Sequence, residues 1–178
     1  KRDGNLFVNE AFKRGASLAV VNNSKKKLRQ IKVKNTLKFL TESSSLLREN
    51  ISSKIIGITG SCGKTSLKEL LGKTLNKISS VTYSKKSFNN KFGVPLSLFN
   101  LKQNNEFGIF EIGMDKKGEI DFLSKIIKPE VGVITNISYA HVKNFKNIKQ
   151  IALAKSEIIK NIVDGGNLIL NADDKFYN

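Results

Sequence analysis

The sequence predicts an α/β domain with a mostly parallel sheet flanked by helices. From residue 55 onward, short apolar runs alternate with segments whose apolar residues recur at helical spacing. The apolar runs are continuous, which is typical of strands buried on both faces of a parallel sheet. A glycine-rich segment, residues 57–65, follows the first of these runs and directly precedes a helical pattern. This strand–loop–helix order is the context in which a protein loop binds phosphate groups.

The elements can be placed in order along the chain. The first fifty residues predict a helix at 10–14, a strand at 18–21 and a second helix at 35–48. Five strands are then expected, at residues 55–59, 81–84, 107–112, 131–135 and 168–170. Helices are expected between them, at residues 66–78, 94–101, 119–127 and 148–162. We place a domain boundary near residue 50, so that residues 1–50 and 51–178 belong to different domains.

Composition narrows the possible classes of protein. At 178 residues, 39% of them hydrophobic, the chain can form one domain, or one domain and part of a second. No stretch approaches the ~20 apolar residues of a membrane span. The single cysteine, Cys62, excludes an internal disulfide and fits a reducing compartment. The chain begins without methionine, so we expect it to be part of a longer protein.

The formal net charge of +16 is the most unusual global property. A nucleic-acid or anionic-membrane partner would explain it, and so would many lysines on solvated faces. Only four of the 31 basic residues are arginine, the residue type preferred for bidentate recognition of bases and phosphates. The lysines are also scattered, apart from the run at residues 25–27. We therefore expect no nucleic-acid partner.

Residues 57–65 read G-I-T-G-S-C-G-K-T and predict a phosphate loop. Glycines let several backbone N–H groups point at one anion, and the following helix adds its positive end. Lys64 would contact the β- and γ-phosphates, and the Thr65 hydroxyl would bind Mg²⁺. We interpret Cys62 as a small loop residue, because no base for a nucleophile is near it in sequence. The alternative is a strand–turn–helix junction with incidental glycines. The predicted nucleotide-binding residues are Gly60, Ser61, Cys62, Gly63, Lys64, Thr65 and Ser66.

Other polar residues lie where the predicted strands and helices end. Glu111 follows a buried run, at the carboxyl end of a strand where α/β proteins bind ligands, although a surface carboxylate is the alternative. His141 is the only histidine, and a lone histidine is usually a satisfied polar residue. Lys155 lies on a predicted helix and would ordinarily be solvated. Asparagines are common in turns, so Asn89 and Asn90 have a turn role as their alternative.

Further motifs follow the glycine-rich loop in a fixed order. The loop has glycines at 57 and 60, where the usual phosphate loop has one at position 58. Downstream are N-N-x-x-G-V-P from residue 89, E-I-G-M from 111, T-N-I from 135, A-H from 140, A-K-x-E-I from 154 and N-A-D-D from 171. Together these motifs resemble the superfamily of Mur ligases and folylpolyglutamate synthases, and the resemblance covers nearly the whole chain.

Within the superfamily, K-T-S-x-K-E from residue 64 looks like the ligase that adds a dipeptide. The resemblance implies a cytoplasmic, monomeric enzyme that joins UDP-MurNAc-tripeptide to D-alanyl-D-alanine through an acyl phosphate, using ATP and Mg²⁺. It implies that residues 1–50 are the C-terminal part of the UDP-substrate-binding domain and a connecting helix. Residues 51–178 would be an incomplete central ATP-binding domain.

The resemblance also implies roles for individual residues. Lys64, Lys155 and His141 would be catalytic. A carbamylated Lys155 would offer oxygen ligands to a metal, which an ammonium would repel. Substrate oxygens would be bound by Asn89, Asn90 and Asn136, and the nucleotide also by Asn171 and Asp174. The implied metal ligands are Thr65, Glu111, His141 and Lys155.

Three alternatives remain at this point. The protein could be another Mur ligase or a folylpolyglutamate synthase. It could be a phosphate-loop NTPase that uses its positive charge to bind nucleic acid. It could also be a fragment that retains nucleotide binding without catalysis.

Overall fold

The computed structural model describes the chain except for residues 1–2, 25–27, 140–143 and 178. The chain divides into two compact units, residues 1–43 and 44–178. The division falls inside α2 (Thr36–Glu49), N-terminal to the boundary predicted near residue 50. In the described ranges, no helix is both long and apolar enough to cross a membrane.

The first unit is a small α/β element. It contains η1 (Gly4–Phe7), α1 (Val8–Lys13) and the parallel strands β1 (Ala19–Val21) and β2 (Gln30–Lys32), followed by the start of α2. The Asp3 carboxylate accepts a hydrogen bond from the backbone N–H of Asn5 and so caps η1. The predicted first helix and first strand are present, shifted by one or two residues. Strand β2 was not predicted, because its three residues include only one apolar side chain, that of Ile31.

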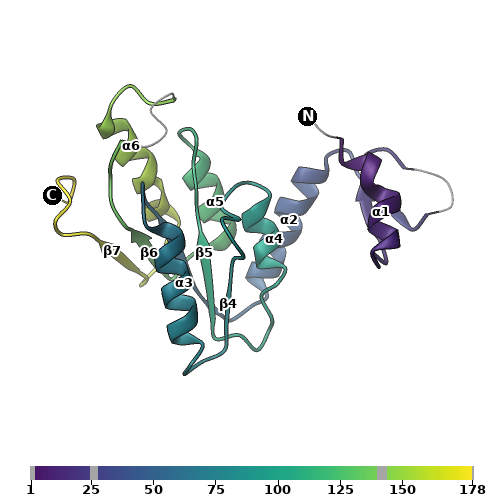
Figure 1. Ribbon diagram of the computed structural model, residues 1–178, viewed down its shortest axis with the longest axis horizontal. Coiled ribbons are helices and arrows are strands. Elements are labelled where there is room, and N and C mark those ends of the chain that lie inside the picture. The colour runs from purple at the N-terminus through teal and green to yellow at the C-terminus, as the bar shows by residue number, and fades with distance from the viewer. Residues whose placement is uncertain (1–2, 25–27, 140–143, 178) are drawn as a thin grey trace. The chain divides into compact units, whose positions relative to one another are not determined.

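The second unit is built on a five-stranded sheet whose strands are all parallel (Figure 1). Its order is β4 (Val81–Tyr83), β5 (Phe107–Glu111), β3 (Lys54–Thr59), β6 (Val131–Ile134) and β7 (Asn167–Leu170). All five predicted strands are present, and the predicted α/β class is confirmed. Because β3 is central, its carboxyl end lies between those of β5 and β6, where ligands of open α/β sheets bind.

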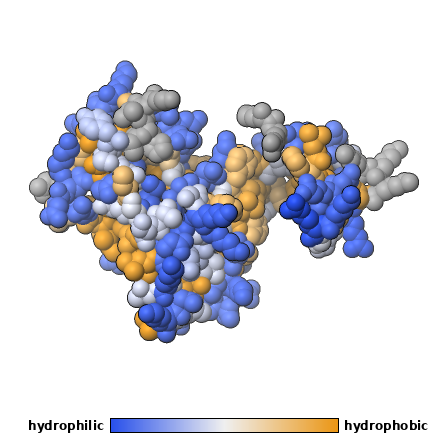
Figure 2. Space-filling model, in the orientation of Figure 1, coloured by the Kyte–Doolittle hydropathy of each residue, from blue (hydrophilic) through white to orange (hydrophobic). Residues whose placement is uncertain are grey.

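Helices cover the two faces of this sheet unequally. The larger core joins one face to α4 (Gly93–Leu98), α5 (Glu119–Ile127) and α6 (Ile148–Lys155), and to η3 (Ser156–Asn161). The smaller core joins the other face to α3 (Lys64–Leu75), which packs against β3, β4 and β5. Apolar residues remain visible beside α3 on the face shown in Figure 2. The strand that precedes the glycine-rich loop is therefore buried on both faces.

Three predicted helices end earlier than expected. The helix predicted at 66–78 is α3, which ends at Leu75 and leaves Ile78 82% exposed. The helix predicted at 94–101 is α4, which ends at Leu98, and Leu101 is buried from the turn that follows. The helix predicted at 148–162 is α-helical only to Lys155 and continues as the 3₁₀-helix η3. In each case an apolar residue beyond the helix extended the sequence pattern.

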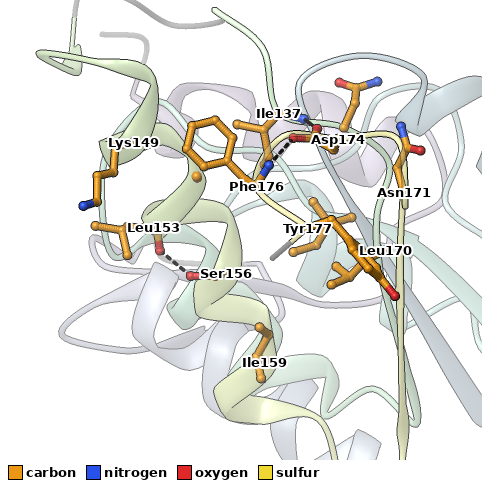
Figure 3. A pocket seen from close by; sticks show the side chains of 13 residues that line it. Ile137, Lys149, Leu153, Ser156, Ile159, Leu170, Asn171, Asp174, Phe176 and Tyr177 are labelled. Carbon is orange, nitrogen blue, oxygen red and sulfur yellow. Dashed lines mark hydrogen bonds between the residues drawn. The ribbon is translucent and has the colours of Figure 1, made fainter.

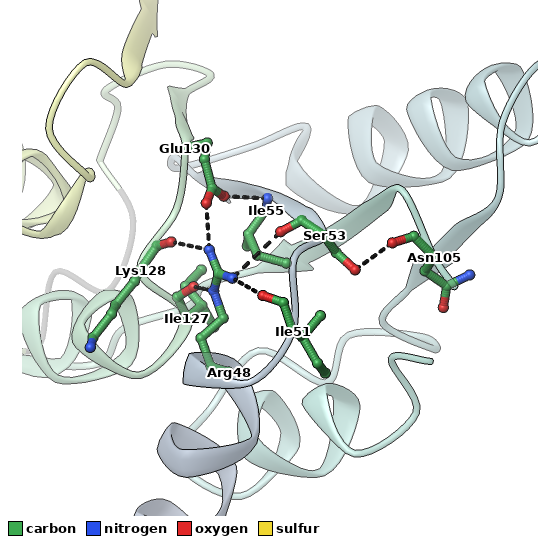
Figure 4. Close-up of polar contacts among 8 residues, drawn as sticks. All are labelled: Arg48, Ile51, Ser53, Ile55, Asn105, Ile127, Lys128 and Glu130. Atoms are coloured by element: carbon green, nitrogen blue, oxygen red, sulfur yellow. Dashed lines mark hydrogen bonds and ion pairs between the residues drawn. The ribbon is translucent and has the colours of Figure 1, made fainter. Parts of the chain in front are cut away.

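A buried arginine joins the end of α2 to the sheet unit (Figure 4). Arg48 is 7% exposed. Its guanidinium donates to the carbonyl oxygens of Ile127 (2.7 Å) and Lys128 (2.9 Å) and to a carboxylate oxygen of Glu130 (2.6 Å). The other Glu130 oxygen accepts the backbone N–H of Ile55 at the start of β3. Arg48 thus satisfies carbonyls at the end of α5, where a helix has no partners of its own.

We expect Arg48→Met to lower the free energy of unfolding by about 2–4 kcal/mol, because it leaves a half-buried carboxylate and several carbonyls without a partner. Arg14→Met is the matched control. Its guanidinium pairs with Glu10 on the surface, so its loss should cost less than about 1 kcal/mol. Urea denaturation of both variants measures the difference. Equal losses in the two variants would contradict this role for Arg48.

Candidate functional site

The loop between β3 and α3 needs glycine at two positions. Gly60 has a φ of 145°, and a Cβ there would lie 1.9 Å from the hydroxyl oxygen of Thr135. Gly63 has a φ of 80° and immediately precedes α3. Residues with side chains rarely adopt either conformation. The two glycines therefore permit both the close approach to β6 and the turn into the helix.

Among the described residues, no side chain accepts a hydrogen bond from the first backbone N–H groups of α3. The other helices that follow a strand of this sheet are capped by side-chain oxygens that accept backbone N–H groups of the first turn. Asn90 caps α4, Glu157 caps α5 and Asn147 caps α6. The N-cap of α3 is Gly63, and no distant side chain among the described residues replaces a cap there, as Glu157 does for the glycine N-cap of α5. Free N–H groups and the positive end of the helix dipole make such a terminus suited to an anion.

Residues that follow β6 hold the loop in place. The Asn136 side chain accepts the backbone N–H of Cys62 (3.0 Å) and donates to the Cys62 carbonyl (3.3 Å). The Thr135 hydroxyl donates to the same carbonyl (2.6 Å). The Ser61 hydroxyl exchanges hydrogen bonds with the backbone of Ser138. Asn136, predicted to bind substrate, thus has its side chain on the loop backbone.

Lys64 lies across the loop. Its ammonium donates to the carbonyl of Gly60 (2.8 Å) and, at a longer distance, to that of Ser61 (3.4 Å). Ser66, the last predicted nucleotide-binding residue, has an exposed side chain in the first turn of α3. The Lys64 ammonium and the first backbone N–H groups of α3 therefore lie together at one helix terminus.

Glu111 is in contact with two other residues predicted for the site, Thr65 and Asn89. It ends β5, is 1% exposed, and so is not the surface carboxylate of the alternative interpretation. One carboxylate oxygen accepts the Thr65 hydroxyl and the other accepts the Asn89 amide, each at 2.7 Å. Adjacent oxygen ligands of an octahedral Mg²⁺ lie about 2.9 Å apart, so the Thr65 and Glu111 oxygens suit a shared ion in spacing and chemistry. In the described ranges no three His, Cys, Asp or Glu side chains gather.

Asn89 and Asn90 differ in their surroundings. The Asn89 carbonyl accepts the backbone N–H of Gly113 (2.7 Å), and its side chain packs where a Cβ on Gly113 would clash. Asn89 therefore faces Glu111. The Asn90 side chain accepts the backbone N–H groups of Phe92 and Gly93 (3.0 Å). The turn role that the sequence left open accounts for Asn90.

Lys155 is buried at the end of α6, with 2% exposure, and is not solvated. Burial and, to a smaller extent, the positive charge of Lys64 lower the pKa of Lys155 to about 8, while Cys62 acts in the opposite direction. No acceptor among the described residues takes a hydrogen bond from its amine. The predicted partner His141 lies outside the described residues. Lys155 and the loop between β3 and α3 are therefore electrostatic neighbours.

Asn171 and Asp174 follow β7 and lie on the far side of β6 from Glu111. The Asp174 carboxylate accepts the backbone N–H groups of Ile137 (2.6 Å) and Phe176 (3.0 Å). Both residues line a mainly apolar pocket of about 240 Å³ between β7 and α6, which also reaches Asn136 (Figure 3). The pocket thus adjoins Asn136, the residue that bonds to Cys62 in the loop between β3 and α3.

Two polar residues near the site were not assigned a role from the sequence. Lys68 on α3 is fully buried, and Glu157 binds the N-terminus of α5. A signal for Lys68 was available, because it lies four residues before the buried Gly72 and so shares its helix face. Glu157 bonds to residues more than thirty positions earlier, which sequence spacing does not reveal.

Known proteins resemble the chain in sequence and structure. Residues 58–178 match the model of the Mur ligase middle domain. The UDP-N-acetylmuramoyl-tripeptide–D-alanyl-D-alanine ligase of Rickettsia prowazekii is 39% identical over 182 residues, which cover 99% of this chain and 40% of that protein.

Two solved structures share the fold closely. The UDP-N-acetylmuramoylalanyl-D-glutamyl-2,6-diaminopimelate–D-alanyl-D-alanyl ligase of Acinetobacter baumannii has a TM-score of 0.88 and 34% identity, with 98% of this chain and 39% of that one covered. The MurF ligase of Thermotoga maritima, solved with ADP, has a TM-score of 0.83 and 30% identity, covering 96% and 40%. The chain thus spans about two fifths of the length of these relatives. The match over residues 58–178 shows that the chain belongs to the Mur ligase family.

Proposed function

We propose that the protein containing this chain is an ATP-dependent ligase that joins UDP-MurNAc-tripeptide to D-alanyl-D-alanine. The observation that carries the proposal is the uncapped N-terminus of α3, with Thr65 hydrogen-bonded to the buried Glu111. The names of relatives in Rickettsia prowazekii and Acinetobacter baumannii support the substrates. The ADP in the Thermotoga maritima structure supports the nucleotide. The activity belongs to the whole protein, of which this chain is part.

In the proposed reaction, the terminal carboxylate of the tripeptide attacks the γ-phosphorus of ATP. A bond forms between the carboxylate oxygen and phosphorus, and ADP leaves. The amine of D-alanyl-D-alanine then attacks the acyl carbon, phosphate leaves, and the amine loses a proton as the amide forms. The enzyme must hold two anionic groups together, the tripeptide carboxylate and the γ-phosphate of ATP, while charge develops on the transferring phosphoryl group.

The described residues suit this task. Backbone N–H groups of the loop and of α3 would bind the phosphates, and Lys64 would exchange the Gly60 carbonyl for a phosphate oxygen. Thr65 and Glu111 would hold a Mg²⁺ ion, which neutralises charge on phosphate oxygens. His141 would join the metal ligands. Asn89 would orient Glu111 by its amide.

We also propose that Lys155 carries a carbamate. The neutral amine would attack CO₂, a nitrogen–carbon bond would form and a proton would pass to solvent. Its burial and its lack of an acceptor among the described residues support this proposal, because a buried ammonium near other cations is costly. The carbamate oxygens would then face the metal site.

The test uses the full-length protein with ATP, Mg²⁺ and UDP-MurNAc-tripeptide. ADP should form when D-alanyl-D-alanine is added and should not form when D-glutamate or single-stranded RNA replaces it. Chelation of Mg²⁺ should stop the reaction. ADP formation that depends on RNA and not on the dipeptide would replace the ligase by a nucleic-acid-dependent NTPase. Activity with a single amino acid alone would indicate a sister ligase.

A further inference from the structure

We propose that Lys68 is a positioning residue for the active site, because its buried ammonium ties α3 to the loop that carries Asn89. The loop comprises residues 84–92, between β4 and α4. The geometric part of this proposal is independent of the reaction, and its effect on catalysis rests on the proposed ligase function. Nothing in the sequence motifs assigned Lys68 a task in the site.

The ammonium of Lys68 is fully buried and lies close to three oxygen atoms. It donates to the Ser84 carbonyl at 2.7 Å and to the Lys86 carbonyl, and it lies 3.1 Å from a carboxylate oxygen of Glu69. Lys86 has a φ of 49°, a left-handed conformation that is uncommon for a residue with a side chain. The lysine therefore binds one carbonyl just before a backbone turn and one within it.

Among the described residues, the turn has two backbone hydrogen bonds of its own, from Phe88 to the Lys85 carbonyl and from Asn89 to the Ser87 carbonyl, and the Phe88 backbone packs beside Gly93. Residues 85–88 are exposed, so apolar packing contributes little to their position. The backbone N–H of Ser84 still bonds to the Ile109 carbonyl, which extends the pairing of β4 with β5. The next tie is at Asn89, where the carbonyl accepts the N–H of Gly113. Between Ser84 and Asn89, Lys68 provides the bond that links the loop to a helix.

Helix α3 influences the position of Glu111 by one direct and one indirect route. Thr65, one turn before Lys68, donates directly to one carboxylate oxygen. Lys68 holds the loop from which Asn89 donates to the other oxygen. The phosphate loop and the proposed metal carboxylate are thereby fixed relative to each other through α3. A shift of the loop would break the bond from Asn89 to one Glu111 oxygen and leave the carboxylate, held by Thr65 through the other oxygen, freer to rotate.

Lys68→Met in the full-length protein removes the charge and keeps most of the side-chain volume. Amide hydrogen exchange in residues 85–90 should become at least about tenfold faster, while exchange in β3 and α6 stays unchanged. Lys73→Met, at an exposed position on the same helix, is the control and should leave exchange unaltered. Unchanged exchange at 85–90 in a folded Lys68→Met protein would overturn the proposal, whatever the enzyme's reaction.

A double-mutant comparison tests the route to Glu111. Lys68→Met and Asn89→Ala should each reduce the rate of ADP formation, and each should raise the Mg²⁺ concentration needed for half-maximal rate. If Lys68 acts through Asn89, the combined variant should lose no more than about the larger single loss, within a factor of two. Multiplied losses would show that Lys68 acts by another route. If Lys68→Met does not fold, Lys68→Gln, which keeps a donor, is compared in the same way.

Discussion

Lys64→Ala should lower the rate of ADP formation by the full-length protein at least about 10³-fold, because it removes the charge that would stabilise the transferring phosphoryl group. Among the described residues, Lys64 donates hydrogen bonds only to carbonyls of its own loop. The fold should therefore survive the substitution, and thermal unfolding should change little. The measurement is a coupled assay for ADP at saturating substrates.

The control for Lys64 is Lys73→Ala, an exposed lysine on the same helix. It should retain the wild-type rate, since surface charges far from the transferred group contribute little. If Lys64→Ala stays within about tenfold of wild type, roughly 1.4 kcal/mol of barrier, residues 57–65 are not the phosphate loop of this enzyme.

Lys155→Ala and Lys155→Arg should both reduce the rate to about 1% or less, as expected for loss of a group that stabilises charge at the reacting centre. The arginine variant keeps the positive charge and cannot form the carbamate. The alanine variant leaves space in a buried site, so added formate or acetate should restore part of the rate by supplying carboxylate oxygens. ADP formation is measured for both variants with and without these acids.

An active Lys155→Arg enzyme would end the carbamate hypothesis and leave Lys155 as a cation near the phosphates. A second readout does not depend on activity. With ¹³C-labelled bicarbonate, wild-type protein should show a carbamate carbon signal that Lys155→Ala lacks. Because the pKa of Lys155 is about 8, more of the amine is neutral as the pH rises from 7 to 9, and the signal should grow over that range.

The parts of the fold that depend on local pattern could be predicted. The three central strands of the second unit, β5, β3 and β6, are mostly apolar and mostly buried, as expected for parallel strands covered on both faces. The edge strands β4 and β7 are only partly buried, but their apolar residues still predicted them. The order of the strands could not be predicted, because pairing joins residues far apart, such as Ile56 with Ile109 and Val131. Helix ends were less certain, since Ile78 and Leu101 extend the apolar spacing beyond α3 and α4.

The candidate site shows the same division. The glycines of the loop between β3 and α3 could be recognised because local backbone geometry requires Gly60 and Gly63 there. Glu111 could be placed at a strand end, but its contacts with Thr65 and Asn89 arise only when three segments meet. The sequence predicted that Asn136 binds substrate. Its hydrogen bond with Cys62 could not be predicted, because the two residues follow different strands, β6 and β3, that are neighbours only in the folded sheet. Tertiary contacts of this kind produce no regular spacing of apolar or polar residues in the sequence.

The capping of the helices has a consequence for competition between anions. The oxygens of Asn90, Glu157 and Asn147 are part of the chain, so their local concentration greatly exceeds that of any dissolved ion. Free phosphate therefore cannot easily displace them from α4, α5 or α6. Within the described part of the second unit, the N-terminus of α3 is left as the helix end where dissolved anions can bind and exchange. Inorganic phosphate and ATP would then compete for the N-terminus of α3. Phosphate that accumulates as product would inhibit the proposed enzyme competitively against ATP. It would not need to bind at a second helix.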